Sequence, residues 1–213
     1  VDSDINPSRG FKLDVDITYE KNKFIEGLDL SDAGTLVTNW AKNDLWRMQQ
    51  SSSLFFAIPS TNRMTISLES IAGTISNVEA DSFFHFFAGG LNGLKGYPFY
   101  SIEGKSMAIA TGTLRVPIFR EKHIPLSWFI LQNCTLGFIG QIGDAWIQSI
   151  EEPNWLRSVG IQWRINGFSF YNFPTAIGLE LHQGLDTFQR QINNKSVTYG
   201  QEQRFYLTIL FGF

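Results

Sequence analysis

Apolar and polar residues alternate along most of this chain, and the alternation is clearest in the last ten residues. One face of that segment is apolar and ends the chain on an aromatic ring: Phe205, Leu207, Ile209, Phe211 and Phe213. The opposite face is mixed: Tyr206, Thr208, Leu210 and Gly212. Because successive side chains of a strand point to opposite faces, this pattern predicts a β-strand. A strand between lipid and a lumen has this pattern, and so does a strand of a soluble sandwich.

The same two-residue period recurs in seven earlier segments, and the chain shows no sustained helical periodicity. The expected strands cover residues 11–19, 45–58, 63–73, 106–118, 131–143, 157–165, 173–182 and 204–213. Opposite their apolar residues, these segments are rich in Gly, Ser, Thr and Gln. Such a face suits a wet or loop-filled lumen better than a dry core. The pattern therefore predicts an all-β fold of about eight antiparallel strands.

The connections between these strands alternate in length. Long connections cover residues 20–44, 74–105, 144–156 and 183–203, and short ones cover 59–62, 119–130 and 166–172. Long loops on one side and short turns on the other are typical of outer-membrane barrels. If the C-terminus is periplasmic, every long loop is extracellular. We therefore expect residues 1–213 to form a transmembrane β-barrel domain, with a soluble β-sandwich as the alternative.

Composition supports the membrane interpretation and narrows the chemistry. Charged residues make up 17% of the chain, less than the roughly one quarter usual in soluble domains. The net charge of −3 and the lack of a basic patch argue against nucleic-acid binding. The single cysteine, Cys134, excludes an internal disulfide, and the three histidines lack metal-ligand spacing. We predict no catalytic residues, no metal and no cofactor.

The long connection 74–105 carries a glycine-rich motif that points to a known family. Gly89 and Gly90 precede Leu94-Lys95-Gly96-Tyr97, and a strand reading Leu114-Arg115-Val116-Pro117 follows. A later strand reads Ile139-Gly140-Gln141-Ile142-Gly143-Asp144-Ala145-Trp146. In this order the motifs resemble the BamA/TamA-type outer-membrane barrel superfamily, also called the bacterial surface antigen barrel. In that family the loop folds into the lumen and its motif rests against the inner wall.

The resemblance implies a location, a function and partners. The family barrel has 16 strands, so these would be its C-terminal half in a bacterial outer membrane, with a periplasmic C-terminus. The chain begins at Val1 without a signal peptide, so we expect it to be a piece of a longer protein. The family inserts or translocates proteins without a cofactor. Its partners would be the lipid bilayer, client outer-membrane proteins and periplasmic or membrane accessory subunits. The strand ending at Phe213 would form one side of a seam that templates incoming strands.

Two departures from the family motif bear on how the loop is held. The family's loop arginine is Lys95 here, and the strand acid that it faces is Gln141. Lysine cannot reproduce the two parallel hydrogen bonds of an arginine–carboxylate pair. The contact is therefore either one ordinary hydrogen bond or is rebuilt with other inner-wall groups. Candidates for that wall are Gln141, Gly143, Arg115 and Glu180, with Glu69, Asp14 and Asp16 as other possible carboxylates.

Several alternatives remain open from the sequence. The motif Leu94–Tyr97 could be a tight glycine turn on a surface loop. Eight strands could close into a small barrel of their own. The domain could also be a passive anchor for a fused or upstream hydrolase or propeller, or a soluble β-sandwich binding module.

Overall fold

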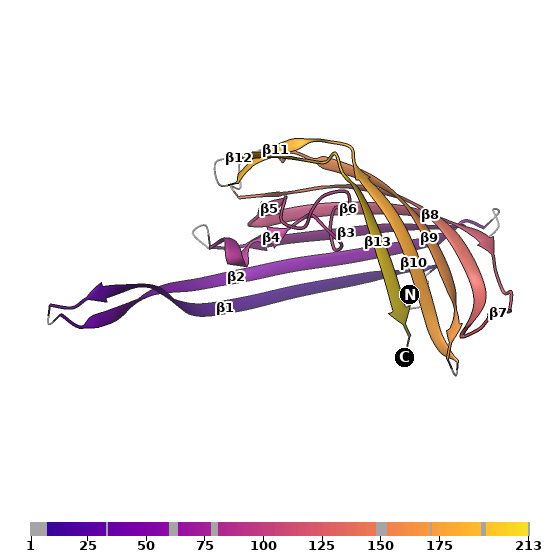
Figure 1. Cartoon of the computed structure of the whole chain (residues 1–213), viewed down its shortest axis with the longest axis horizontal. Helices are drawn as coiled ribbons and strands as arrows, with labels where there is room; N and C mark the ends of the chain where they lie inside the picture. Colours follow the sequence, from indigo (N-terminus) through magenta and orange to yellow (C-terminus); the bar gives the residue numbers. More distant parts are fainter. Residues whose placement is uncertain are drawn as a thin grey trace.

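A large antiparallel sheet dominates the structure, a computed structural model that describes residues 8–32, 34–59, 64–77, 81–147, 153–170, 172–192 and 195–212. The predicted all-β fold class is confirmed. The strands follow the order β1-β2-β3-β6-β8-β9-β10-β13, and β7 pairs with β8 (Figure 1). Their bounds are β1 (Gly10–Leu30), β2 (Leu36–Ala57), β3 (Thr65–Ile75), β6 (Ser106–Phe119), β7 (Ile124–Leu126), β8 (Phe129–Trp146), β9 (Leu156–Ser169), β10 (Phe173–Gly184) and β13 (Gln203–Phe211).

The first two strands are much longer than the sequence pattern indicates. The expected loop at 20–44 is wrong, because β1 and β2 stay paired up to Leu30 and Leu36. Together they form a hairpin that projects beyond the rest of the sheet (Figure 1), with a register shift between Ile25 and Gly27. Backbone pairing needs no apolar alternation where neither face of a two-stranded ribbon is covered by the sheet. The polar residues after Tyr19 therefore gave no sign that the strand continues.

The other connections also contain regular structure. The connection from β3 to β6 holds the 3₁₀ turn η1 (Ser82–Phe84) and a small pair of strands, β4 (Phe86–Phe87) and β5 (Glu103–Gly104). The connection from β10 to β13 holds the hairpin of β11 (Phe188–Ile192) and β12 (Lys195–Tyr199). Strand β8 runs to Trp146, and β9 runs to Ser169, so the predicted connections 144–156 and 166–172 are shorter than expected. The short connection 119–130 contains β7.

The two faces of the sheet carry opposite kinds of residue. We call the face that holds the β3–β6 connection the inner face, and the other the outer face. Buried inner-face side chains are mostly polar: Thr113, Gln141, Ser158, Gln162, Glu180 and His182. Exposed outer-face side chains are mostly large and apolar: Phe138, Val159, Ile161, Trp163, Leu181, Phe205, Leu207 and Ile209. This is the reverse of a soluble fold, in which polar groups face water and apolar groups fill the core.

The apolar core lies on the inner face, beneath the β3–β6 connection. Side chains of this connection, which we call the inner loop (residues 76–105), pack against inner-face residues of several strands. The cluster consists of Phe84, Phe86, Ala88, Leu94, Tyr97 and Ile102 from the loop with Leu45, Ile75, Met107, Ile109 and Leu156 from the sheet. The inner loop is therefore an integral part of the fold and not a surface excursion.

The sheet is open. Strands β1 and β13 each have one neighbour in the described part of the chain, and no ladder joins them. No helix among the residues that the structure describes is long and apolar enough to cross a membrane.

Candidate loop-anchoring site

Glycines shape the stretch of inner loop that meets the sheet. Gly90 has a φ of +84°, a conformation that favours glycine. Its N–H lies 3.0 Å from the carbonyl oxygen of Tyr97 and 3.2 Å from that of Leu94. The N–H of Leu94 in turn donates to the carbonyl of Ala88 at 2.7 Å. These bonds fold Gly89–Tyr97 into a compact turn whose outward backbone groups are available to the sheet.

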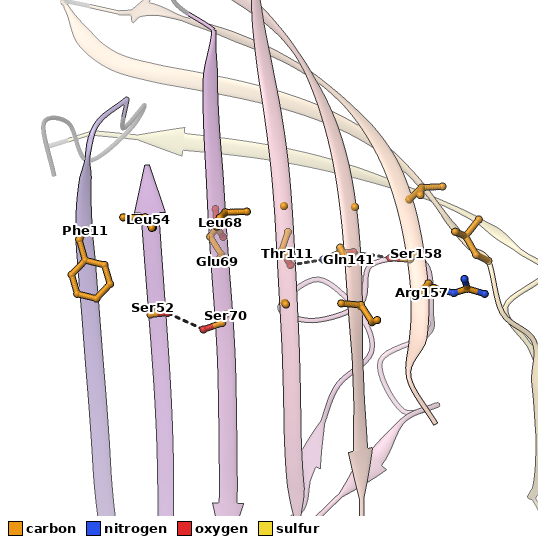
Figure 2. A pocket seen from close by; sticks show the side chains of 16 residues that line it. Phe11, Ser52, Leu54, Leu68, Glu69, Ser70, Thr111, Gln141, Arg157 and Ser158 are labelled. Atoms are coloured by element: carbon orange, nitrogen blue, oxygen red, sulfur yellow. Dashed lines mark hydrogen bonds between the residues drawn. The ribbon is translucent and has the colours of Figure 1, made fainter. Parts of the chain in front are cut away.

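Gln141 on β8 binds the backbone of this turn with both ends of its amide. Its Oε1 accepts hydrogen bonds from the Lys95 N–H and the Ser158 hydroxyl, each at 2.9 Å. Its Nε2 donates to the Gly93 carbonyl at 2.8 Å and to the Thr111 hydroxyl at 3.2 Å. Figure 2 shows the contacts of Gln141 with Thr111 and Ser158. A primary amide has two donors and two acceptor lone pairs, so all of them are used here. A carboxylate at this position could not donate to Gly93, which explains why glutamine suits this loop.

The side chain of Lys95 pairs with a carboxylate on β10, and not with a residue of the Gln141 strand β8. Its Nζ lies 2.5 Å from Oε2 of Glu180 on β10, whose side chain is only 5% exposed. The same carboxylate accepts from Gln162 Nε2 at 2.6 Å, and His182 Nε2 lies 2.9 Å from it. Four groups from the loop, β9 and β10 thus share one charge-assisted network. The sequence analysis named Glu180 among the carboxylates that could meet Lys95, and Glu180 is the one that Lys95 contacts.

The terminal strand joins the same site through Tyr206. Its hydroxyl donates to the Lys95 carbonyl at 2.9 Å. Tyr206 lies on the inner face, whereas Phe205, Leu207, Ile209 and Phe211 point outward and are exposed. The apolar seam residues therefore do not contact the motif, and Phe213 lies outside the described residues.

Tyr97 closes the end of the site that lies nearest the β10–β13 connection. It is fully buried, and its hydroxyl lies 2.9 Å from the carbonyl oxygens of both Arg157 and Asp186. Burial raises the pKa of this hydroxyl, so it stays a donor. A Cβ at the neighbouring Gly96 would lie 2.6 Å from the Gly184 nitrogen and 2.7 Å from Ser158 Cβ. Only glycine fits between the loop and the wall at this position.

Two further ion pairs, each with at least one partner in a connection between the long strands, support the loop. Asp186 accepts from Arg157 Nη2 at 2.7 Å and from its backbone N–H at 2.8 Å, and these bonds lower the pKa of Asp186. Burial alone would raise the pKa of Glu103, but hydrogen bonds from Arg190 and His85 outweigh it and lower that pKa. Because Arg190 lies on β11, its ion pair with Glu103 ties the β10–β13 connection to the inner loop.

The other predicted inner-wall residues have smaller roles. Gly143 lies on the inner face, where an added Cβ would approach the Ala108 carbonyl to 2.7 Å. Arg115 borders a cavity of about 480 Å³ together with Lys95 and Gln141. Its Nε and Nη1 have no hydrogen-bond partner among the described residues, so it does not hold the motif through them.

The sequence reasoning missed Ser158, Gln162, Tyr206 and the backbone partners of Tyr97. The alternation along residues 157–165 already placed Ser158 and Gln162 on the polar face of the strand. It could therefore have predicted that both residues face the inner loop. The surface-turn interpretation of the motif does not fit, since Leu94 and Tyr97 are both 0% exposed. No described group of three or more His, Cys, Asp or Glu residues could hold a metal ion.

Comparisons with protein-family models, curated proteins and solved structures found no match.

We expect Gln141→Glu to loosen the inner loop at neutral pH. The new carboxylate would face the Gly93 carbonyl without a proton to donate, which costs roughly 1–3 kcal/mol for a buried unsatisfied group. Amide hydrogen exchange of residues 88–97 should therefore quicken. Gln201→Glu, at an exposed loop position, is the matched control. Equal exchange in both variants would show that the Gln141 amide does not hold the loop.

We expect Lys95→Ala to make the inner loop sensitive to protease, because it leaves the buried Glu180 carboxylate without its cation. The protection lost should correspond to about 1–3 kcal/mol, measured as the rate of cleavage within residues 88–100 of the folded protein. The double variant Lys95→Ala/Glu180→Gln should recover part of the protection. Lys12→Ala, which removes an exposed lysine, is the control. Unchanged cleavage in Lys95→Ala would contradict the role of the ion pair.

Proposed function

We propose that this chain forms part of the wall of an outer-membrane β-barrel that inserts or translocates proteins. The observation that carries the proposal is the inverted sheet, with an apolar outer face and a polar inner face that holds a folded-in loop. In a bilayer the outer face is buried in lipid, and the inner face lines a lumen. A bacterial outer-membrane location and a periplasmic C-terminus are part of the same proposal.

The dimensions of the sheet support a membrane location. A tilted transmembrane strand needs about 9–11 residues, and β6, β9 and β10 have 14, 14 and 12. Aromatic rings gather near both ends of the strands. Tyr19 and Trp46 lie 5.0 Å apart at the level where β3 ends beside β2, and Trp128 stacks on Phe170 at 5.7 Å near the opposite end of the sheet. Such rings are typical of the two interfaces of a membrane barrel.

The free edges support the insertion activity over a passive wall. An unpaired strand edge presents N–H and C=O groups that can template a further strand. Strand β13 has such an edge, and Tyr206 links this strand to Lys95 of the inner loop. The edge strand is thus tied to the inner loop, and an exposed edge can pair with an added strand. The 16-stranded barrel, its client proteins and its accessory subunits are part of this proposal. No bond chemistry and no cofactor are needed.

The membrane orientation can be tested with spin labels on two neighbouring residues of β13. In a background with Cys134 replaced by Ser, Leu207→Cys reports the outer face and Thr208→Cys reports the inner face. In reconstituted vesicles, the label at 207 should be accessible to oxygen dissolved in the bilayer. The label at 208 should be accessible instead to a water-soluble paramagnetic complex. Equal accessibility of both labels to the aqueous reagent would indicate a soluble sheet.

The insertion activity can be tested by photo-crosslinking during client assembly. A photoreactive residue at Leu207, beside the free edge of β13, should crosslink to an outer-membrane protein that is arrested during insertion. The same residue at Ile161, on the outer face in mid-sheet, should not. A protein that inserts into membranes but gives no crosslink at position 207 would be a passive anchor.

A further inference from the structure

Three lysines gather on one face at the base of the projecting β1–β2 hairpin. Lys21 and Lys23 on β1 and Lys42 on β2 are all exposed. Lys23 lies directly opposite Lys42 in the register, and Lys21 lies opposite Asp44. Opposed residues of an antiparallel pair share a face, so three ammonium groups stand there beside one carboxylate.

This face is a continuation of the outer face of the sheet. Leu45 and Arg47 of β2 point inward, the first being buried and the second bonded to the Phe84 carbonyl. The alternate positions of β2, including Lys42, therefore point outward, and so do their partners on β1. The lysines thus lie on the same side as the exposed apolar residues of the strand below: Phe11, Leu13, Val15, Ile17 and Tyr19.

The facing lysines repel each other, and their neighbours offset only part of the repulsion. Like charges directly opposite each other in a sheet are destabilising. Lys23 Nζ lies 4.5 Å from the Trp40 ring centroid, a cation–π contact that is attractive, and the Lys23–Lys42 pair is flanked by the Ile25–Trp40 pair. Apolar neighbours reduce the screening of the two charges by water. An anionic group between the lysines would convert this repulsion into attraction.

The position along the strand matches the depth of lipid headgroups. The aromatic pair Tyr19–Trp46 is followed by the lysine rows two and four residues later. At about 3.3 Å per residue, Lys23 lies roughly 13 Å beyond Tyr19 along the strand, and less along the membrane normal because barrel strands tilt. The headgroup layer is about 5–8 Å thick on each side of the hydrocarbon. Flexible lysine side chains reach across the remaining distance.

We propose that Lys21, Lys23 and Lys42 form a binding site for the phosphate groups of anionic lipids at the extracellular rim of the barrel. The inference rests on the proposed membrane location and adds a ligand class and its residues. The site fixes the rotation and depth of the β1 edge relative to the bilayer.

The test uses nanodiscs that contain equal amounts of phosphatidylglycerol and phosphatidylcholine. Native mass spectrometry of the protein released from them measures the preference for the anionic lipid. Each lysine near an anionic surface contributes a factor of about five in affinity. We therefore expect Lys23→Gln/Lys42→Gln to reduce the preference roughly 20-fold. The charge-matched control Lys12→Gln/Lys195→Gln should reduce it less than twofold.

The outcomes separate this inference from the proposed function. A protein that does not enter nanodiscs at all contradicts the membrane barrel itself. A protein that enters them but shows no anionic preference overturns the lysine site alone. An equal loss in the two double variants also overturns it, because the effect would then follow net charge and not position.

Discussion

The hydrogen bonds of the Gln141 amide connect the inner loop to the wall of the sheet, and most of the inner-face organisation depends on them. One side chain satisfies a backbone donor and a backbone acceptor of the loop while it also binds Thr111 and Ser158 on the two flanking strands. Gly93, Gln141 and Ser158 are buried, so the loss of a bond between them leaves a polar atom without water. The turn at Gly89–Tyr97 can therefore lie inside the structure although its backbone is irregular.

This anchor differs from an arginine–carboxylate pair because its neutral and its charged contacts are made by different residues. Gln141 on β8 hydrogen-bonds to the backbone of the loop. Glu180, which lies on β10 two strands further along the sheet, pairs with the ammonium group of Lys95. Glu180 is in turn held by Gln162 and His182, which keeps its oxygens oriented. Lys95 and Gln141 thus divide the charged and the directional contacts between them. Lysine needs a single strong acceptor, and glutamine supplies the directional bonds that lysine lacks.

The inverted faces and the anchored loop are consistent with one another. A polar inner face has many donors and acceptors to satisfy, and the backbone and lysine of the loop satisfy those of Gln141 and Glu180. The apolar outer face is stabilised by contact with an apolar surrounding, for the same reason that a soluble core is stabilised by burial. Tyr206 extends the anchor to the free edge of β13, so the loop, the wall and the edge form one connected unit.

The sequence by itself determined the fold class, the faces of the strands and the position of the motif. Side-chain alternation is a local property, so the outward Phe205 and the inward Gln141 and Glu180 could be read from it. Only the tertiary structure decided that β1 and β2 extend to Leu30 and Leu36, because ladder hydrogen bonds join backbones and carry no side-chain signal. It also decided which carboxylate meets Lys95, since Glu180 lies 85 residues away in the chain. The partners of Gln141 in the loop are backbone groups, which every residue has, so only the folded register could select them.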